Sequence, residues 1–191
     1  MIDPAHGGTE SGAVLNPVIL EKDVTLAIAR QLHQELSNRG LQAQLLREGD
    51  ATVSTDQRAA MVNAARPTLY LSIHASSQGT GLRIYTAMLP FGGDDLGPFV
   101  HWQRAQSAVL ARSRSVQQQI AIAIQRLKFP VRSLPAPLKP LNNITVPALA
   151  VEVAPTAGDI SQLAASDYQR MISVVLANSL ASQRSGLESA P

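Results

Sequence analysis

The chain has 191 residues, 45% of them hydrophobic and 16% charged, which is the size and composition of one globular domain with its own hydrophobic core. No apolar run approaches the roughly 18 residues of a membrane-spanning helix, and a formal net charge of +2 is too small for a nucleic-acid-binding surface. Cysteine is absent, so disulfides are excluded and any metal ion would need nitrogen and oxygen ligands.

The N-terminal third predicts a strand, a helix and a second strand. The chain opens on residues 1–4, where a buried strand should already be running, so we expect the first strand to be truncated. A glycine-rich loop follows at residues 3–12. Residues 22–38 have apolar side chains at helical spacing, and residues 41–46 alternate as in a half-buried strand. The apolar stripe of the helix consists of Val24, Ile28, Leu32 and Leu36.

The central part continues this alternation. We expect a helix over residues 56–65, a buried strand over 69–74 and another strand over 81–88. Residues 89–97 are rich in turn-forming residues, and residues 99–127 have the Ala, Gln, Arg and Ile content of a largely helical segment.

The C-terminal part predicts a loop, a strand and a closing helix. The proline-rich residues 129–140 are expected to form the loop. Residues 146–153 are expected to form a nearly continuous apolar strand, interrupted by one carboxylate, Glu152. Residues 167–182 predict the last helix, and residues 183–191 a polar tail. The helix offers for packing Met171, Val174, Val175 and Leu180.

This order predicts a single α/β domain over residues 1–182, with a twisted, mostly parallel or mixed sheet and helices on both faces. Ligands of such folds bind beyond the carboxyl ends of the strands. The loop with His6 follows the first strand, and His74 and Glu152 lie near the ends of two others. These three side chains should therefore meet at one edge of the sheet.

Taken alone, each candidate residue has a simpler explanation. His6 can be a loop histidine with local hydrogen bonds, and His74 can cap a strand. Glu21 precedes the first long helix, where a carboxylate interacts favourably with exposed amides. Glu152 is the clearest anomaly, because an ionised carboxylate in a buried strand is costly unless it is paired, metal-bound or protonated. The simpler explanation of Glu152 is that its strand lies at the edge of the sheet, so that the carboxylate faces water.

Taken together, His6, Glu21 and His74 form the set of two histidines and one carboxylate that catalytic zinc uses, with a fourth position for water. The chain has no HExxH motif, so the fold would have to assemble these dispersed ligands. Spacing alone identifies such a site poorly. The residues by themselves favour a metal-dependent hydrolase as a hypothesis.

Four motifs occur in the order found in one enzyme family. They are DPAHGGTESGA (residues 3–13), LEKDVTLAIARQL (20–32), LSIHAS (71–76) and VPALAVEVA (146–154). Together they resemble the zinc-dependent N-acetylmuramoyl-L-alanine amidases of the amidase-3 type. The resemblance implies that His6, Glu21 and His74 bind Zn²⁺, and that Glu152 is the catalytic base. Further positions that match the family's pattern are Arg47, Asp50, Arg58 and Asn63.

The resemblance implies hydrolysis of the amide bond between N-acetylmuramic acid and L-alanine in peptidoglycan. It further implies an exported monomer of the periplasm or cell wall, which contacts the glycan strand and the stem peptide. Three departures from the family's pattern are Ala5 for Gly, Ser76 for Asn, and residues 154–158 in place of a GF.SN element. The last of these alters the wall of the site. Two alternatives therefore stay open: a zinc-binding but inactive or autoinhibited peptidoglycan-binding module, and a metal amidohydrolase of another acylated amine.

Residues 89–113 form an insertion-like segment that holds the only tryptophan, Trp102, beside His101. One interpretation is a flap over the substrate groove. The other is a surface helix that packs Phe99 and Trp102 into a local cluster. His33 lies in a predicted helix and is expected to face solvent.

Overall fold

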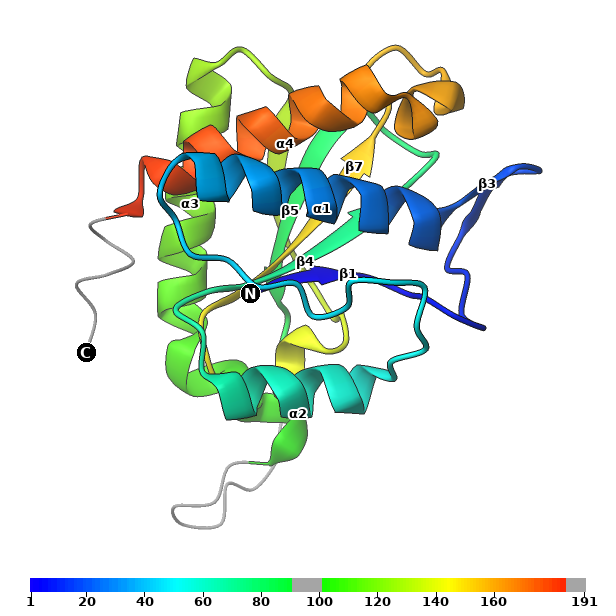
Figure 1. Ribbon diagram of the computed structural model, residues 1–191. Coiled ribbons are helices and arrows are strands. Elements are labelled where there is room, and N and C mark those ends of the chain that lie inside the picture. The colour runs from blue at the N-terminus through cyan, green and yellow to red at the C-terminus, as the bar shows by residue number, and fades with distance from the viewer. Residues whose placement is uncertain (91–100, 185–191) are drawn as a thin grey trace.

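The computed structural model describes residues 1–90 and 101–184. Its centre is a five-stranded sheet with strand order β1-β4-β7-β5-β6 (Figure 1). Strands β1, β4 and β7 run parallel, whereas β5 runs antiparallel to β7 and parallel to β6. The sheet is therefore mixed, as predicted. Its strands are β1 (Ile2–Pro4), β4 (Tyr70–Ala75), β7 (Ala148–Ala154), β5 (Gly81–Ala87) and β6 (Val131–Ala136).

Helices cover both faces of this sheet. The α-helices are α1 (Glu21–Asn38), α2 (Thr55–Ala65), α3 (Leu110–Arg126) and α4 (Ser166–Ala181). Helices α1 and α4 lie side by side over one face (Figure 1), and α3 shares the hydrophobic core beneath them. Helix α2 packs on the other face in a second, smaller core, together with the 3₁₀ helix η2 (Leu141–Asn143). The prediction of one α/β domain with helices on both faces is confirmed.

The alternation of side chains along the strands explains why both faces are apolar. Side chains of a strand point to opposite faces in turn. In β7, Leu149, Val151 and Val153 enter the larger core, whereas Ala148 and Ala150 enter the smaller one. Glu152 continues the second row. The carboxylate thus belongs to the α2 face of a central strand. The predicted apolar stripe of α1 is confirmed, since all four of its members are buried.

Two predictions of strand and loop are wrong. Residues 41–46 form no strand and pair with β1 only through an isolated bridge between Ile2 and Leu45. The short β1 offers little edge for further pairing. Residues 129–140 are not a simple loop, because they contain β6. Strand β6 lies at the sheet edge, where Pro135 is tolerated because an outward amide is not needed for the ladder.

The remaining differences are smaller. The predicted helix over residues 99–127 is divided into a 3₁₀ helix, η1 (Trp102–Val109), and α3. Met171 does not pack into the core, since it is 39% exposed. Unexpected from the sequence are a hairpin of β2 (Val14–Asn16) and β3 (Ile19–Leu20) and a 3₁₀ helix, η3 (Ile160–Ala164). Most of the predicted turn-rich segment and of the polar tail lies outside the described residues. Among the described helices none has the length and apolar character needed to cross a membrane.

Candidate metal centre and active site

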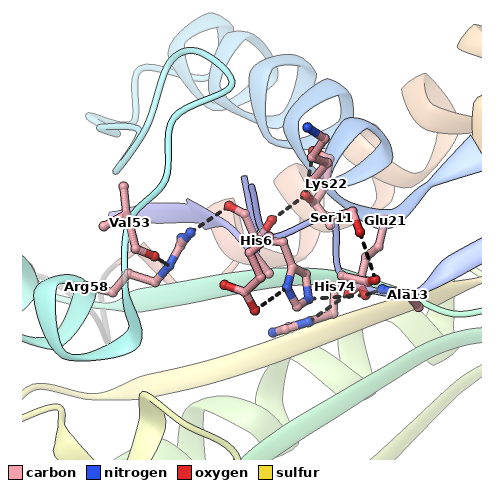
Figure 2. A network of polar contacts seen from close by, with 12 residues as sticks. His6, Ser11, Ala13, Glu21, Lys22, Val53, Arg58 and His74 are labelled. Atoms are coloured by element: carbon pink, nitrogen blue, oxygen red, sulfur yellow. Dashed lines mark hydrogen bonds and ion pairs between the residues drawn. The ribbon is translucent and has the colours of Figure 1, made fainter. Parts of the chain in front are cut away.

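His6, Glu21 and His74 lie together at the carboxyl edge of the sheet. His6 is in the loop after β1, Glu21 is the first residue of α1, and His74 is near the end of β4. One ligand atom from each lies within 4.8 Å of the others. Figure 2 shows both imidazoles directed at the carboxylate: His6 Nε2 is 3.2 Å from Glu21 Oε2, and His74 Nδ1 is 2.9 Å from Glu21 Oε1. The structure thus brings together the three predicted ligands.

Glu21 is the fixed centre of this cluster. Besides the two imidazoles, the backbone amides of Ala13 and Ala75 donate to its carboxylate at 2.9 and 3.2 Å. Its place at the start of α1 also favours negative charge. Burial raises the pKa of Glu21, but the hydrogen bonds with His6, His74 and Ala13 lower it by more. The net result is a pKa well below the usual range. Glu21 is therefore an ionised carboxylate inside the protein.

The cluster suits a small divalent cation such as zinc. Nitrogen and oxygen ligands lie about 2.0–2.2 Å from Zn²⁺, which places neighbouring ligand atoms roughly 3–3.5 Å apart. The two imidazole–carboxylate separations are close to this range. Glu10 Oε1 lies 3.0 Å from His6 Nδ1, so it orients the ring with Nε2 toward the site. The hydrogen bond with Glu21, opposed by burial, raises the pKa of His6. A bound cation would therefore replace a proton between these groups.

Gly12 lies in close contact with two of the three candidate ligands. A Cβ at this position would lie 2.5 Å from His6 Cδ2 and 2.7 Å from Glu21 Oε2, and the backbone has a φ of +68°. Both observations require glycine here. Neither Glu10 nor Gly12 was singled out from the sequence, although both lie in the first motif. The four-residue spacing from His6 to Glu10 was the available signal.

Two buried arginines hold the loop that carries His6. Arg58 donates to the carbonyls of His6 at 2.6 Å and Pro4 at 3.1 Å. Arg47 donates to the carbonyls of Pro4 at 2.9 Å and Ala5 at 3.1 Å. These bonds stabilise a loop in which His6 itself has a φ of +62°, a conformation that costs non-glycine residues energy. The family-matching arginines therefore fix the backbone of a candidate ligand.

The charge of Arg58 is balanced by Asp3. This carboxylate is fully buried in β1, forms an ion pair with Arg58 and accepts a hydrogen bond from Tyr70. Burial and the nearby Asp3 charge raise the pKa of Tyr70 well above its usual value, so its hydroxyl stays a donor.

The other two family-matching residues have structural roles. Asp50 accepts a hydrogen bond from the Gly8 amide at 2.6 Å and pairs with Lys22 at 2.7 Å, which ties the His6 loop to α1. Asn63, in α2, donates to the Asn143 carbonyl at 2.8 Å and accepts from the Thr145 amide at 2.8 Å. Asp50 thus supports the site, whereas Asn63 anchors η2.

Glu152 lies next to the ligand cluster, on β7. In the strand register it is directly opposite His74 of β4 on one side and Arg83 of β5 on the other. Its carboxylate forms an ion pair with Arg83, and its side chain is 25% exposed. Because β7 is the central strand, the sheet-edge alternative is wrong, and pairing explains how the carboxylate is accommodated. Arg83 was not identified from the sequence, although an arginine between apolar residues of a strand is the same anomaly as Glu152.

The described part of the insertion-like segment packs elsewhere. Gln106 donates to the carbonyls of Ile144 at 2.6 Å and Val146 at 3.0 Å, just before β7 begins. This is the end of the strand opposite to Glu152. Trp102 is 46% exposed, and Phe99 lies outside the described residues. Residues 101–113 therefore offer no support for a flap over the site. His33, in α1, is partly buried and is not part of the ligand cluster.

Parts of this chain are similar in sequence to known proteins. Over 75 residues the chain is 39% identical to the N-acetylmuramoyl-L-alanine amidase AmiA of Salmonella typhimurium. The aligned residues make up 39% of this chain and 26% of that protein. It is 36% identical over 91 residues to the probable cell wall amidase LytH of Staphylococcus aureus, 44% of this chain and 30% of that protein. The chain thus spans less than a third of these relatives.

A solved structure agrees over nearly the whole chain. The N-acetylmuramoyl-L-alanine amidase AmiC2 of Nostoc punctiforme superposes with a TM-score of 0.74 at 24% identity, covering 96% of this chain and 95% of that one. At this identity the similarity establishes the fold. Residues 1–182 also match the sequence profile of the Amidase_3 family, described as N-acetylmuramoyl-L-alanine amidase. This chain therefore belongs to the N-acetylmuramoyl-L-alanine amidase family.

Proposed function

We propose that this chain is a zinc-dependent hydrolase of the amide bond between N-acetylmuramic acid and L-alanine in peptidoglycan. The observation that carries the proposal is the convergence of His6, Glu21 and His74 at the sheet edge, with Glu152 on the adjacent strand. Membership of the family supports the choice of substrate. His6, Glu21 and His74 hold the zinc ion, and Glu152 carries out proton transfer.

The ligand set fits zinc in number and chemistry. Two imidazoles and one carboxylate would leave a bound Zn²⁺ with a net positive charge and a position for substrate or water. When bound, the ion supplies a Lewis acid that acidifies water and polarises a carbonyl group. The protein's part is to hold the three ligands in place, which Glu10, Arg47 and Arg58 help to do.

The proposed role of Glu152 is general acid–base catalysis. Its side chain is partly exposed, and in the strand register it lies directly opposite the candidate ligand His74. Amide hydrolysis needs a base to take the proton of the attacking water and an acid to protonate the leaving amine. Glu152 performs both steps in turn, because the carboxylic acid formed in the first step supplies the proton of the second.

The substrate fixes where the protein acts. Peptidoglycan lies outside the cytoplasmic membrane, so we place the chain there, as an exported monomer of the periplasm or cell wall. Its substrate contacts are the glycan strand and the stem peptide.

Digestion of purified peptidoglycan sacculi tests the proposal. We expect the chain to release stem peptides with a free N-terminal L-alanine, identified by mass, and to leave the glycan strands uncut. Exhaustive chelation should abolish the release, and added Zn²⁺ should restore it. Cleavage of glycosidic bonds, or cleavage within the stem peptide, would overturn the reaction assigned. Undiminished release by a preparation free of zinc would overturn the metal dependence. Hydrolysis of a small muropeptide alone would point to a different substrate.

A further inference from the structure

Arg83 belongs to a row of polar side chains that crosses three strands. The register places His74 of β4 opposite Glu152 of β7, and Glu152 opposite Arg83 of β5. Because β5 runs antiparallel to β7, its beginning lies at the edge where β4 and β7 end. The guanidinium therefore reaches the site from the side of Glu152 that faces away from the ligand cluster.

The guanidinium of Arg83 is held in one place. It pairs with Glu152 and donates to the Gln78 carbonyl at 2.7 Å. Gly79, in the loop between β4 and β5, lies against it: a Cβ there would be 2.8 Å from Arg83 Nη1, and Gly79 has a φ of +83°. The loop of residues 76–80 thus packs closely around the side chain of Arg83. The guanidinium that pairs with Glu152 therefore has little freedom to move.

Stability of the fold gives a weak reason for this arrangement. A partly exposed ion pair contributes little to the free energy of unfolding, because water screens the charges. The neighbours of Arg83 in β5, Leu82 and Ile84, are fully buried, so the strand packs through them. Orientation is a stronger reason, because a reacting group misplaced by about 1 Å can lose on the order of a hundredfold in rate.

We propose that Arg83 is a positioning residue for Glu152. It holds Oε1 of the carboxylate, and the second oxygen, Oε2, then serves in proton transfer. This inference rests on the proposed function of Glu152. Through Gln78 and Gly79, the loop between β4 and β5 sets the position of Arg83 and so that of the carboxylate.

A kinetic double-mutant cycle on the full chain tests the proposal. The variants are Arg83→Gln, Glu152→Gln and the double variant, assayed on peptidoglycan with zinc content measured for each. We expect Arg83→Gln to lower kcat on the order of tenfold or more, with KM little changed. The double variant should be no slower than Glu152→Gln, because Arg83 acts through that carboxylate. Arg83→Lys should recover part of the loss.

The matched control is Arg132→Gln. Arg132 lies opposite Arg83 on the exposed edge strand β6, so this variant removes the same charge one strand further from Glu152. It should keep wild-type kcat. Multiplied losses in the double variant would overturn the inference, as would wild-type kcat for Arg83→Gln. A loss confined to KM would show instead that Arg83 binds an acidic group of the substrate.

A second cycle keeps the inference separable from the proposed function. If the wild-type chain releases nothing from peptidoglycan, the proposed function fails, whereas the Arg83–Glu152 contact can still be measured by urea unfolding of the same four proteins. We expect the shift of the midpoint in the double variant to be smaller than the sum of the two single shifts. Additive shifts would show that Arg83 does not hold Glu152.

Discussion

The two carboxylates of the site are held in opposite ways. The side chain of Glu21 is 7% exposed and is surrounded by two imidazoles and two backbone amides. The side chain of Glu152 is 25% exposed, and its partner is one arginine. This contrast suits the two proposed roles. A metal ligand must keep its position while substrate comes and goes, which many directional contacts ensure. A proton-transfer group must keep one oxygen accessible, which a single contact on the other oxygen allows.

Removal of Arg58, which supports the loop of the candidate ligand His6, should have the largest of the expected effects, because it breaks a buried ion pair. Arg58→Ala leaves the fully buried Asp3 without its counter-ion and frees the His6 carbonyl. We expect the free energy of unfolding to fall by about 3–5 kcal/mol, the usual cost of breaking a buried ion pair. Chemical denaturation measures this loss. Arg132→Ala, on the exposed edge strand, should change the same quantity by less than about 0.5 kcal/mol. Equal effects would contradict a special role for Arg58.

Substitutions of Glu152 and of His74 distinguish the proposed base from a proposed metal ligand. Glu152→Gln keeps the shape of the side chain but cannot accept a proton, so it should retain zinc and lose on the order of a hundredfold in turnover, which is about 2.7 kcal/mol. His74→Ala should instead lose most of its zinc, whereas His33→Ala should keep it. Zinc stoichiometry and turnover are measured on the same preparations. Full zinc with wild-type turnover in Glu152→Gln would refute the assignment of the base.

The smallest of the three effects concerns the close packing of Gly12 against the ligand cluster. In Gly12→Ala the added methyl group would collide with His6 and Glu21, and the backbone would be strained. We expect zinc affinity to fall about 10- to 100-fold, a range typical of disturbed ligand orientation. Competition with a chromogenic chelator measures it. Gly49→Ala is the control, since its Cβ would meet no atom within 4 Å. Unchanged affinity in Gly12→Ala would mean that the ligands can shift without loss.

The sequence predicts the Glu21 side of the site better than the Glu152 side. His6, Glu21 and His74 lie in motifs whose order resembles a known family, and helical spacing identifies α1 directly. The partner of Glu152 could not be predicted, because residues 81–88 indicate a strand without its direction or its neighbour. Only the antiparallel placement of β5 beside β7 brings Arg83 to the carboxylate.

Two predictions of strand and loop were wrong because sequence composition does not show which strands have a partner. Residues 129–140 have the composition of a loop, yet an edge strand can include Pro135 because one of its sides needs no hydrogen-bond donor. Residues 41–46 have the alternation of a strand, yet they form only one bridge with the short β1. In both cases the availability of a partner strand, which is a tertiary property, decides the outcome.

The position of β7 has a consequence for the order in which the domain folds. Strands β4 and β5 follow each other in the chain with only residues 76–80 between them, yet β7 lies between them in the sheet. Each of them pairs with β7, which is made much later, and contacts between residues so distant in sequence form slowly. During synthesis, which proceeds from the N-terminus, the residues of the ligand cluster are made before β7, and Glu152 cannot face them until β7 is made. A nascent chain is thereby incapable of the proposed proton transfer until its central strand is inserted.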